Sequence, residues 1–270
     1  MKSKITGGAT EKIFSATILN KHQVDYYKCL ETGFIQTEEP YWLEEAYSSA
    51  ITKLDVGLVY RNEDLRGHVV PILSKYFNAE GLFLDYAGGY GLFTRMMRDK
   101  GFNFYHTDAY CKNIFAEYFD LDDLPKGQKF ELLTAFEVFE HLPNPLEEIE
   151  KMSSLADNIL FSTVLVPQSP LNSVDDWWYF IPETGQHVAM FTVQALEYLA
   201  NKLGYHFYTN GDNLHLFTKS ALASNPFQKN KEPFLVRKAR KILKKFNAKN
   251  VPERETLLMK DWEYIKTKLS

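Results

Sequence analysis

The sequence predicts an α/β fold built on an open, mostly parallel sheet, and three observations carry this prediction. Short apolar runs alternate with amphipathic stretches between residues 82 and 217, which is the pattern of strands joined by helices. The first run ends in a glycine-rich turn that leads into a helix-like stretch. The last two runs flank Asn210 and Gly211, a pair typical of a hairpin turn.

The composition is that of a soluble globular protein. The 270 residues are 45% hydrophobic and 24% charged, enough for one large domain or one and a half. Aromatic residues reach 15%, so we expect an aromatic-lined pocket beside the core. No apolar run approaches the roughly 20 residues of a membrane span, and residues 1–15 lack a signal-peptide centre. With Cys29 and Cys111 as its two cysteines, the protein is expected to be cytoplasmic.

A buried strand and a glycine turn follow one another at residues 82–91, Leu-Phe-Leu-Asp-Tyr-Ala-Gly-Gly-Tyr-Gly. The stretch from Leu92 to Lys100 then has the spacing of a helix. Because glycine has no Cβ, such a turn lets a ligand pack directly on the backbone, so we expect a nucleoside-bearing cofactor here. A dinucleotide fingerprint would need glycine where Thr94 stands, and no G-K-[ST] follows for a phosphate loop. A purely structural turn is the alternative.

Two further strands end in polar residues. The strand at 102–107 ends at Asp108, about 20 residues after the glycines, where a carboxylate can accept hydrogen bonds from both ribose hydroxyls. Capping of the following turn is the alternative for Asp108. The strand at 130–136 leads directly into Glu137-Val138-Phe139-Glu140-His141-Leu142-Pro143-Asn144-Pro145.

Taken in order, these segments resemble class I S-adenosylmethionine-dependent methyltransferases. Residues 85–91 resemble the first motif, D-x-G-x-G-x-G, with Ala87 in place of its first glycine, and residues 137–145 resemble the segment "evleHl.dp". The resemblance covers residues 65–220 and is nearest to methyltransferase-domain proteins of bacterial sugar and surface-polysaccharide pathways. It implies a Rossmann-like, seven-strand-type sheet with an antiparallel last strand, and S-adenosylmethionine as cofactor. The expected cofactor contacts are Asp85, Ala87, Gly88, Gly89, Gly91, Asp108, Tyr110, Phe136, Glu137 and Arg61.

One stretch departs from the family. Only 21 residues, 109–129, separate Asp108 from the next strand, too few for a helix, a third strand and their loops. We therefore expect the third strand to be missing or vestigial. The family's adenine contact follows that strand, and Tyr110 and Asp120 are the candidates here. Arg61 and Tyr47, upstream, are candidates for contact with the methionine carboxylate.

The expected chemistry needs a base as well as a cofactor. Methyl transfer from a sulfonium is an in-line displacement, and a hydroxyl acceptor must also lose its proton, for which histidine is suited. His187, just after the fifth strand, is the favoured base and His141 the second, with a structural histidine as the alternative for each. Glu137 or Glu140 is expected near the charged methionine end of the cofactor.

The loop after the fifth strand is the expected acceptor site. Its sequence Asp175-Asp176-Trp177-Trp178-Tyr179-Phe180 places aromatic rings beside carboxylates, which suits a sugar or a nucleoside. Core aromatic residues are the alternative. The expected acceptor contacts are Asp175, Trp177, Trp178, Tyr179 and Glu140.

Three parts are expected along the chain: residues 1–64, 65–220 and 221–270. Residues 1–11 are expected to be disordered, and residues 12–37 to form a hairpin that looks like a zinc-ribbon remnant. A knuckle cysteine is replaced by Thr32 and no second cysteine pair exists, so no metal is expected. The third part is expected to be helical, and nine Lys or Arg stand against one Glu in residues 226–250. Its segment 229–249 is expected to contact an anionic membrane or a phosphorylated ligand, or to dock on the domain, and no nucleic-acid partner is expected.

The leading functional hypothesis is O-methylation of a small polar acceptor, such as a sugar, a sugar nucleotide or a surface-glycan precursor. No N-P-P-[YF] motif follows the fourth strand, which disfavours methylation of amino groups on DNA bases. A nicotinamide-dependent oxidoreductase or epimerase and a non-catalytic cofactor-binding protein are the alternatives. The oligomeric state does not follow from the sequence.

Overall fold

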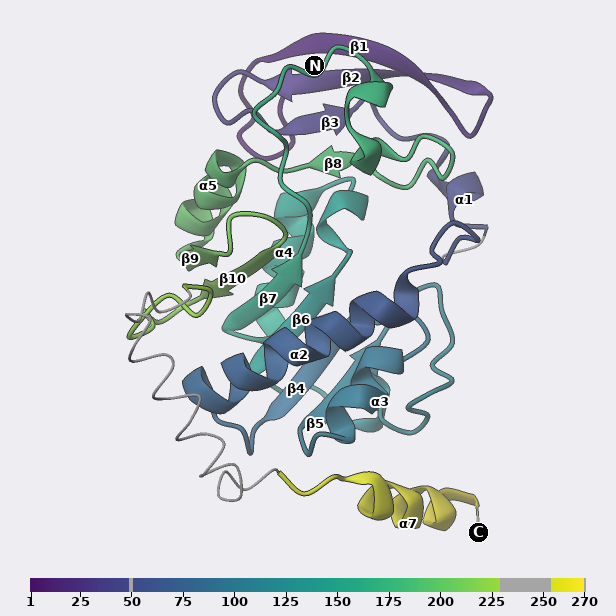
Figure 1. Ribbon diagram of the computed structural model, residues 1–270, viewed down its shortest axis with the longest axis vertical. Coiled ribbons are helices and arrows are strands. Elements are labelled where there is room, and N and C mark those ends of the chain that lie inside the picture. Colours follow the sequence, from purple (N-terminus) through teal and green to yellow (C-terminus); the bar gives the residue numbers. More distant parts are fainter. Residues whose placement is uncertain (49–50, 229–253, 270) are drawn as a thin grey trace, which may run out of the picture.

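The computed structural model describes residues 1–48, 51–228 and 254–269, and a six-stranded sheet lies at its centre (Figure 1). The strand order is β5-β4-β6-β7-β10-β9. The neighbours in the first four positions are parallel, and β10 runs antiparallel to both β7 and β9. The expected mostly parallel sheet with an antiparallel end is confirmed. The strands are β4 (Leu82–Tyr86), β5 (Asn103–Thr107), β6 (Leu132–Phe136), β7 (Asn158–Ser162), β9 (His206–Thr209) and β10 (Leu214–Thr218).

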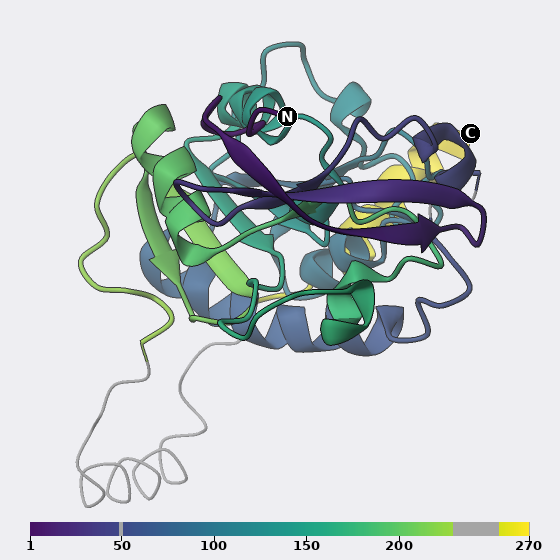
Figure 2. The same cartoon turned by 90° about the horizontal axis from the view of Figure 1, so that it is seen from above.

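Helices cover both faces of this sheet (Figure 2). On one face lie α2 (Leu58–Tyr76) and α3 (Leu92–Arg98), and on the other α4 (Pro145–Leu155) and α5 (Val193–Leu203). Successive strand residues face opposite layers, as the pleat requires: Leu132 packs with α2 and α3, and Leu133 with α4 and α5. Strands that are buried on both faces appear in a sequence as continuous apolar runs, which explains why these strands could be predicted from the sequence.

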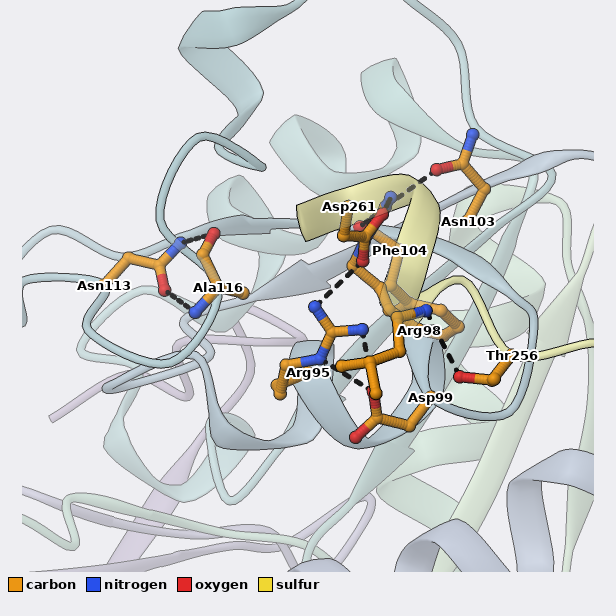
Figure 3. Close-up of polar contacts among 10 residues, drawn as sticks. Arg95, Arg98, Asp99, Asn103, Phe104, Asn113, Ala116, Thr256 and Asp261 are labelled. Atoms are coloured by element: carbon orange, nitrogen blue, oxygen red, sulfur yellow. Dashed lines mark hydrogen bonds and ion pairs between the residues drawn. The ribbon is translucent and has the colours of Figure 1, made fainter. Parts of the chain in front are cut away.

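The third strand is absent from the described part of the sheet, as expected. β5 forms the edge, and a single parallel bridge between His106 and Asp120 stands where a third strand would begin. The C-terminal helix α7 (Leu258–Leu269) lies beside this edge. Figure 3 shows Arg95 and Arg98 of α3 meeting Asp261 of α7, with Arg98 bonded twice to that carboxylate at 2.8 and 2.6 Å.

A four-stranded antiparallel sheet lies at the opposite end from α7 (Figure 1). The predicted hairpin appears as β1 (Thr10–Ile18) and β2 (His22–Cys29), followed by β3 (Ile35–Thr37) and a single helical turn, α1 (Leu43–Ala46). The fourth strand, β8 (Ala189–Met190), comes from the segment after β7 and pairs with β3. The remaining short elements are single 3₁₀ turns at Leu121–Asp123, Phe139–His141, Val174–Asp176 and Trp178–Phe180.

The expected disorder of residues 1–11 is wrong. Ile5 is buried in the main core, and the Lys4 amide donates a 2.8 Å hydrogen bond to Gln36 Oε1. The segment is mostly polar, so the buried position of Ile5 could not be recognised from its composition. The basic segment 229–249 falls outside the described residues. Among the helices that are described, none combines the length and the apolar character needed to cross a bilayer.

Candidate cofactor and acceptor site

The glycine turn lies at the switch point of the central sheet. Because β4 stands between β5 and β6, the chain crosses from one side of β4 to the other, which opens a crevice at the carboxyl end of β4. Ala87, Gly89 and Gly91 occupy this turn with φ of 54°, 59° and 80°. A Cβ on Gly91 would lie 2.2 Å from Asn113 Oδ1, so this position requires glycine for space as well as for its dihedral angles.

Asp85 supports the turn from beneath. Its buried carboxylate accepts hydrogen bonds from Thr134 Oγ1 at 2.9 Å and Thr94 Oγ1 at 3.1 Å. A Cβ on Gly88 would lie 2.5 Å from Asp85 Oδ2. Burial raises the pKa of Asp85 to about 6. Asp85 therefore links β4 to β6 and α3, and the turn can pass over its carboxylate because Gly88 has no Cβ.

His106 is a site residue that the sequence interpretation missed. Its Nε2 lies 2.9 Å from the Gly89 carbonyl, and its Nδ1 lies 2.9 Å from Asp120 Oδ1. Since a carbonyl only accepts, Nε2 carries a proton and ties the glycine turn to β5. The alternation of buried and half-buried residues along β5 places His106 on the inward side, a signal present in the sequence.

Asp108 connects the turn to the loop that follows β5. Its Oδ2 accepts the Gly89 amide at 2.9 Å, and its Oδ1 accepts the amides of Tyr110 and Cys111 at 2.7 Å each. The turn-capping role left open by the sequence is therefore present. A carboxylate offers about four acceptor positions, so about one remains for a ribose hydroxyl. The contact with ribose stays a prediction.

A cavity of about 380 Å³ opens beside Asp108. This volume lies within the range of small-molecule pockets, about 300–1,000 Å³. Asp120, one of two candidates for contact with adenine, lines it; Tyr110 is mostly exposed and stacks on Tyr47 with ring centroids 4.7 Å apart. The cavity is lined in part by His106, Asp108, Asn113, Tyr118, Asp120 and Asp122.

Two glutamates follow β6 at the other side of the turn. Glu137 adopts a φ of 54°, and the Ser162 hydroxyl accepts its amide at 2.8 Å and donates to its Oε1 at 2.6 Å. Burial and the adjacent Glu140 raise the pKa of Glu137 to about 7, and burial likewise raises the pKa of Glu140 to about 7. Arg61 Nε lies 3.9 Å from Glu137 Oε2, while its Nη2 donates to Asp55 at 2.9 Å. Arg61 thus lies between Asp55 and Glu137, and its contact with the methionine carboxylate stays a prediction.

The structure brings the two predicted histidines together. Their ring centroids lie 4.8 Å apart, although 46 positions separate His141 from His187 in the chain. His141 Nδ1 lies 3.1 Å from the Gln186 carbonyl, and His187 Nδ1 lies 2.6 Å from the Tyr179 carbonyl. Each Nδ1 therefore carries a proton and each Nε2 keeps a free lone pair. Burial lowers the pKa of His141 to about 4 and that of His187 to about 3, so both rings are neutral near pH 7.

The aromatic loop divides into core and surface residues. Trp177 and Tyr179 are buried beneath the four-stranded sheet with Phe180, the core role that the sequence left open. Trp178 is 70% exposed, and Asp175 is exposed as well. Of the expected acceptor contacts, Trp178 and Asp175 are therefore free to meet a ligand from solvent. Phe136, an expected cofactor contact, ends β6 and packs edge-on against Phe93.

A known protein family matches more than half of the chain. The sequence model of a family described as a methyltransferase domain matches residues 60–209. No curated protein matches the chain.

Similar solved structures include CalO1, a methyltransferase in calicheamicin biosynthesis, in its SAH-bound form. It is 12% identical, with 66% of this chain and 61% of that chain covered and a TM-score of 0.42. An O-methyltransferase family 2 protein from Planctomyces limnophilus, in complex with apigenin, is 13% identical, with 65% of each chain covered and a TM-score of 0.46. Magnesium protoporphyrin IX methyltransferase from Synechocystis, with bound SAM, is 16% identical, with 65% of this chain and 89% of that chain covered and a TM-score of 0.40. The chain thus spans about six-tenths of the length of the first of these proteins.

Proposed function

Because this chain belongs to the methyltransferase-domain family, and is therefore an enzyme that uses S-adenosylmethionine, we propose that it methylates a hydroxyl group of a small polar acceptor. A sugar, a sugar nucleotide or a surface-glycan precursor is the proposed acceptor class. The observation that carries the choice of a hydroxyl is the pair of neutral imidazoles, His141 and His187, each with an unprotonated Nε2 beside the glutamates that follow β6.

The residues at the switch point fit S-adenosylmethionine. Among the residues that the structure describes, a Cβ on Gly89 would meet only Ile51 Cδ1, at 3.4 Å, which leaves room for a ligand on the outer side of the turn. Asp108 and the cavity beside it would hold the ribose and adenine. The carboxyl groups of Glu137 and Glu140 are buried, and the positive ammonium or sulfonium group of the cofactor beside them would stabilise their ionised forms.

When bound, the cofactor supplies an activated methyl group. The protein's own part is to align the acceptor oxygen with that methyl group and to receive the hydroxyl proton. His187 is the favoured receiver, at Nε2, because the Tyr179 carbonyl holds its ring by Nδ1. His141 is the second candidate. Trp178 and Asp175, exposed on the adjoining loop, would contact the acceptor.

The test has two stages. Calorimetry with S-adenosylmethionine and its demethylated product should give binding of one molecule per chain. Methyl transfer from labelled S-adenosylmethionine is then measured with a panel of sugars and sugar nucleotides, and with amino sugars in which the candidate hydroxyl is replaced by an amine. Transfer to hydroxyl acceptors, lost in His187→Gln, supports the proposal; transfer to the amine alone contradicts O-methylation.

A further inference from the structure

We propose that Glu140, His141 and His187 together bind a divalent transition-metal ion. One ligand atom from each of these side chains can be chosen so that all three lie within 4.8 Å of one another. The Val188 amide donates to the Glu140 carbonyl at 2.9 Å, so the backbone itself holds the His187 loop against the turn that carries the other two residues. The prediction of no metal rested on the cysteines, and this cluster contains none.

The two histidines are oriented as metal ligands are. A histidine that binds a metal through one ring nitrogen nearly always donates the other N–H to a carbonyl or a carboxylate. Here both Nδ1 atoms face backbone carbonyls, of Gln186 and Tyr179, so both Nε2 lone pairs remain free.

Glu140 adds a buried carboxylate to the two imidazoles. Its side chain is fully buried, and the polar groups beside its carboxylate are the hydroxyls of Tyr179 and Thr163. Hydroxyl groups carry no charge that would balance an ionised carboxylate in this buried position, whereas a metal ion between Glu140 and the imidazoles would.

The ligand set indicates the kind of metal. Two imidazoles and one carboxylate suit Zn²⁺, Mn²⁺, Fe²⁺ or Co²⁺ better than Mg²⁺ or Ca²⁺, which prefer oxygen ligands. Three protein ligands also leave a coordination position open, as catalytic sites do. The three ligand atoms must move somewhat closer than 4.8 Å on binding, since metal–nitrogen and metal–oxygen bonds are about 2.0–2.2 Å long.

The open position assigns a chemical role to the metal, and this role rests on the proposed function. An acceptor hydroxyl bound there would have a lowered pKa, as metal-bound water does, and would lose its proton to solvent. Its oxygen would then form the O–CH₃ bond while the S–CH₃ bond breaks and sulfur keeps the electron pair. In this refinement of the proposed function, Nε2 of each histidine binds the metal, so the histidines serve as ligands and the proton leaves to solvent.

The test uses the full chain, stripped with a chelator and then titrated with Co²⁺ while its visible absorption is recorded. One Co²⁺ per chain, with a ligand-field band that Zn²⁺ abolishes, is expected. His187→Gln and Glu140→Gln should each weaken Co²⁺ binding at least about tenfold, and His68→Gln, an exposed histidine of α2, should not. Circular dichroism checks that the variants are folded, and the isosteric Glu140→Gln serves if His187→Gln does not fold.

Two results would overturn the proposal: no stoichiometric Co²⁺ binding to the wild type, or unchanged binding in the folded variants. Calorimetry with S-adenosylmethionine on the stripped protein separates this failure from that of the proposed function. Binding and turnover without metal leave the methyltransferase proposal standing and remove only the metal. Absence of S-adenosylmethionine binding with and without metal contradicts the proposed function instead.

Discussion

Replacement of Asp108 by alanine should weaken S-adenosylmethionine binding without unfolding the protein. The lost hydrogen bond to ribose is one between a charged acceptor and a neutral donor, which is worth about 1.5–3 kcal/mol. At about 1.4 kcal/mol per factor of ten, this energy corresponds to a dissociation constant raised roughly 10- to 150-fold. Titration calorimetry at fixed ionic strength measures this change directly.

The same substitution has a separate effect on the free protein, because Asp108 accepts the amides of Gly89, Tyr110 and Cys111. Loss of about 1.5 kcal/mol, the lower bound for one such bond, would lower Tm by roughly 3–6 °C in a protein of this size. Asp108→Asn separates the hydrogen bonds to the two loop amides from the hydrogen bond to Gly89. The amide oxygen of the substituted side chain can still accept from the two loop amides, while its NH₂ group faces the Gly89 amide. We expect Asp108→Asn to melt between the wild type and Asp108→Ala.

The control is Asp64→Asn, which removes the charge of an exposed carboxylate on α2, distant in the sequence from Asp108. It should leave both the dissociation constant and Tm unchanged. If folded Asp108→Ala binds S-adenosylmethionine within about twofold of the wild type, then Asp108 only caps its turn, and the assignment of the ribose to this residue is wrong.

Three further substitutions test the support of the site. Gly91→Ala should abolish cofactor binding and destabilise the protein. Gly127 has a similar φ of 82°, but no described atom lies within 4 Å of a Cβ built on it, so Gly127→Ala should cost only the roughly 1–2 kcal/mol of a left-handed residue. Equal denaturation midpoints for the two variants would contradict this. Asp261→Asn leaves a buried arginine without its anion and should cost about 3–5 kcal/mol in urea unfolding, while Glu263→Gln on the same helix should be neutral. Since burial raises the pKa of Asp85 to about 6, against about 3.9 when unfolded, the wild type should lose roughly 3 kcal/mol of stability as pH rises from about 4 to 6; Asp85→Asn should lack this pH-dependent loss.

The part of the candidate site around the glycine turn could be predicted from the sequence because its residues are close together in the chain. The glycine turn, β5 and Asp108 all belong to a single βαβ unit. In such a unit the residue that follows each strand lies at the same edge of the sheet, so the turn and Asp108 are expected to be close together. The missing third strand followed from length alone, since the 21 residues after Asp108 leave no room for it. That α7 lies beside the exposed edge could not be predicted, because the contact depends on Asp261 reaching Arg98 from 163 positions away.

The arrangement of residues around His141 and His187 could not be predicted from the sequence, because it depends on contacts between residues far apart in the chain. The Trp42 indole donates to the Gly185 carbonyl at 2.8 Å, and the Gln186 side chain donates to the Ala46 carbonyl at 3.0 Å, so contacts over 140 residues or more set the loop that carries His187. Pattern reasoning treated His141 and His187 as competing bases because nothing in the sequence places them 4.8 Å apart. Once they are adjacent, with Glu140 beside them, the question changes from which histidine removes the proton to what the three residues bind together. The four-stranded sheet, by pairing β3 with β8, therefore helps to hold the segment that carries His187 and also covers one end of the molecule.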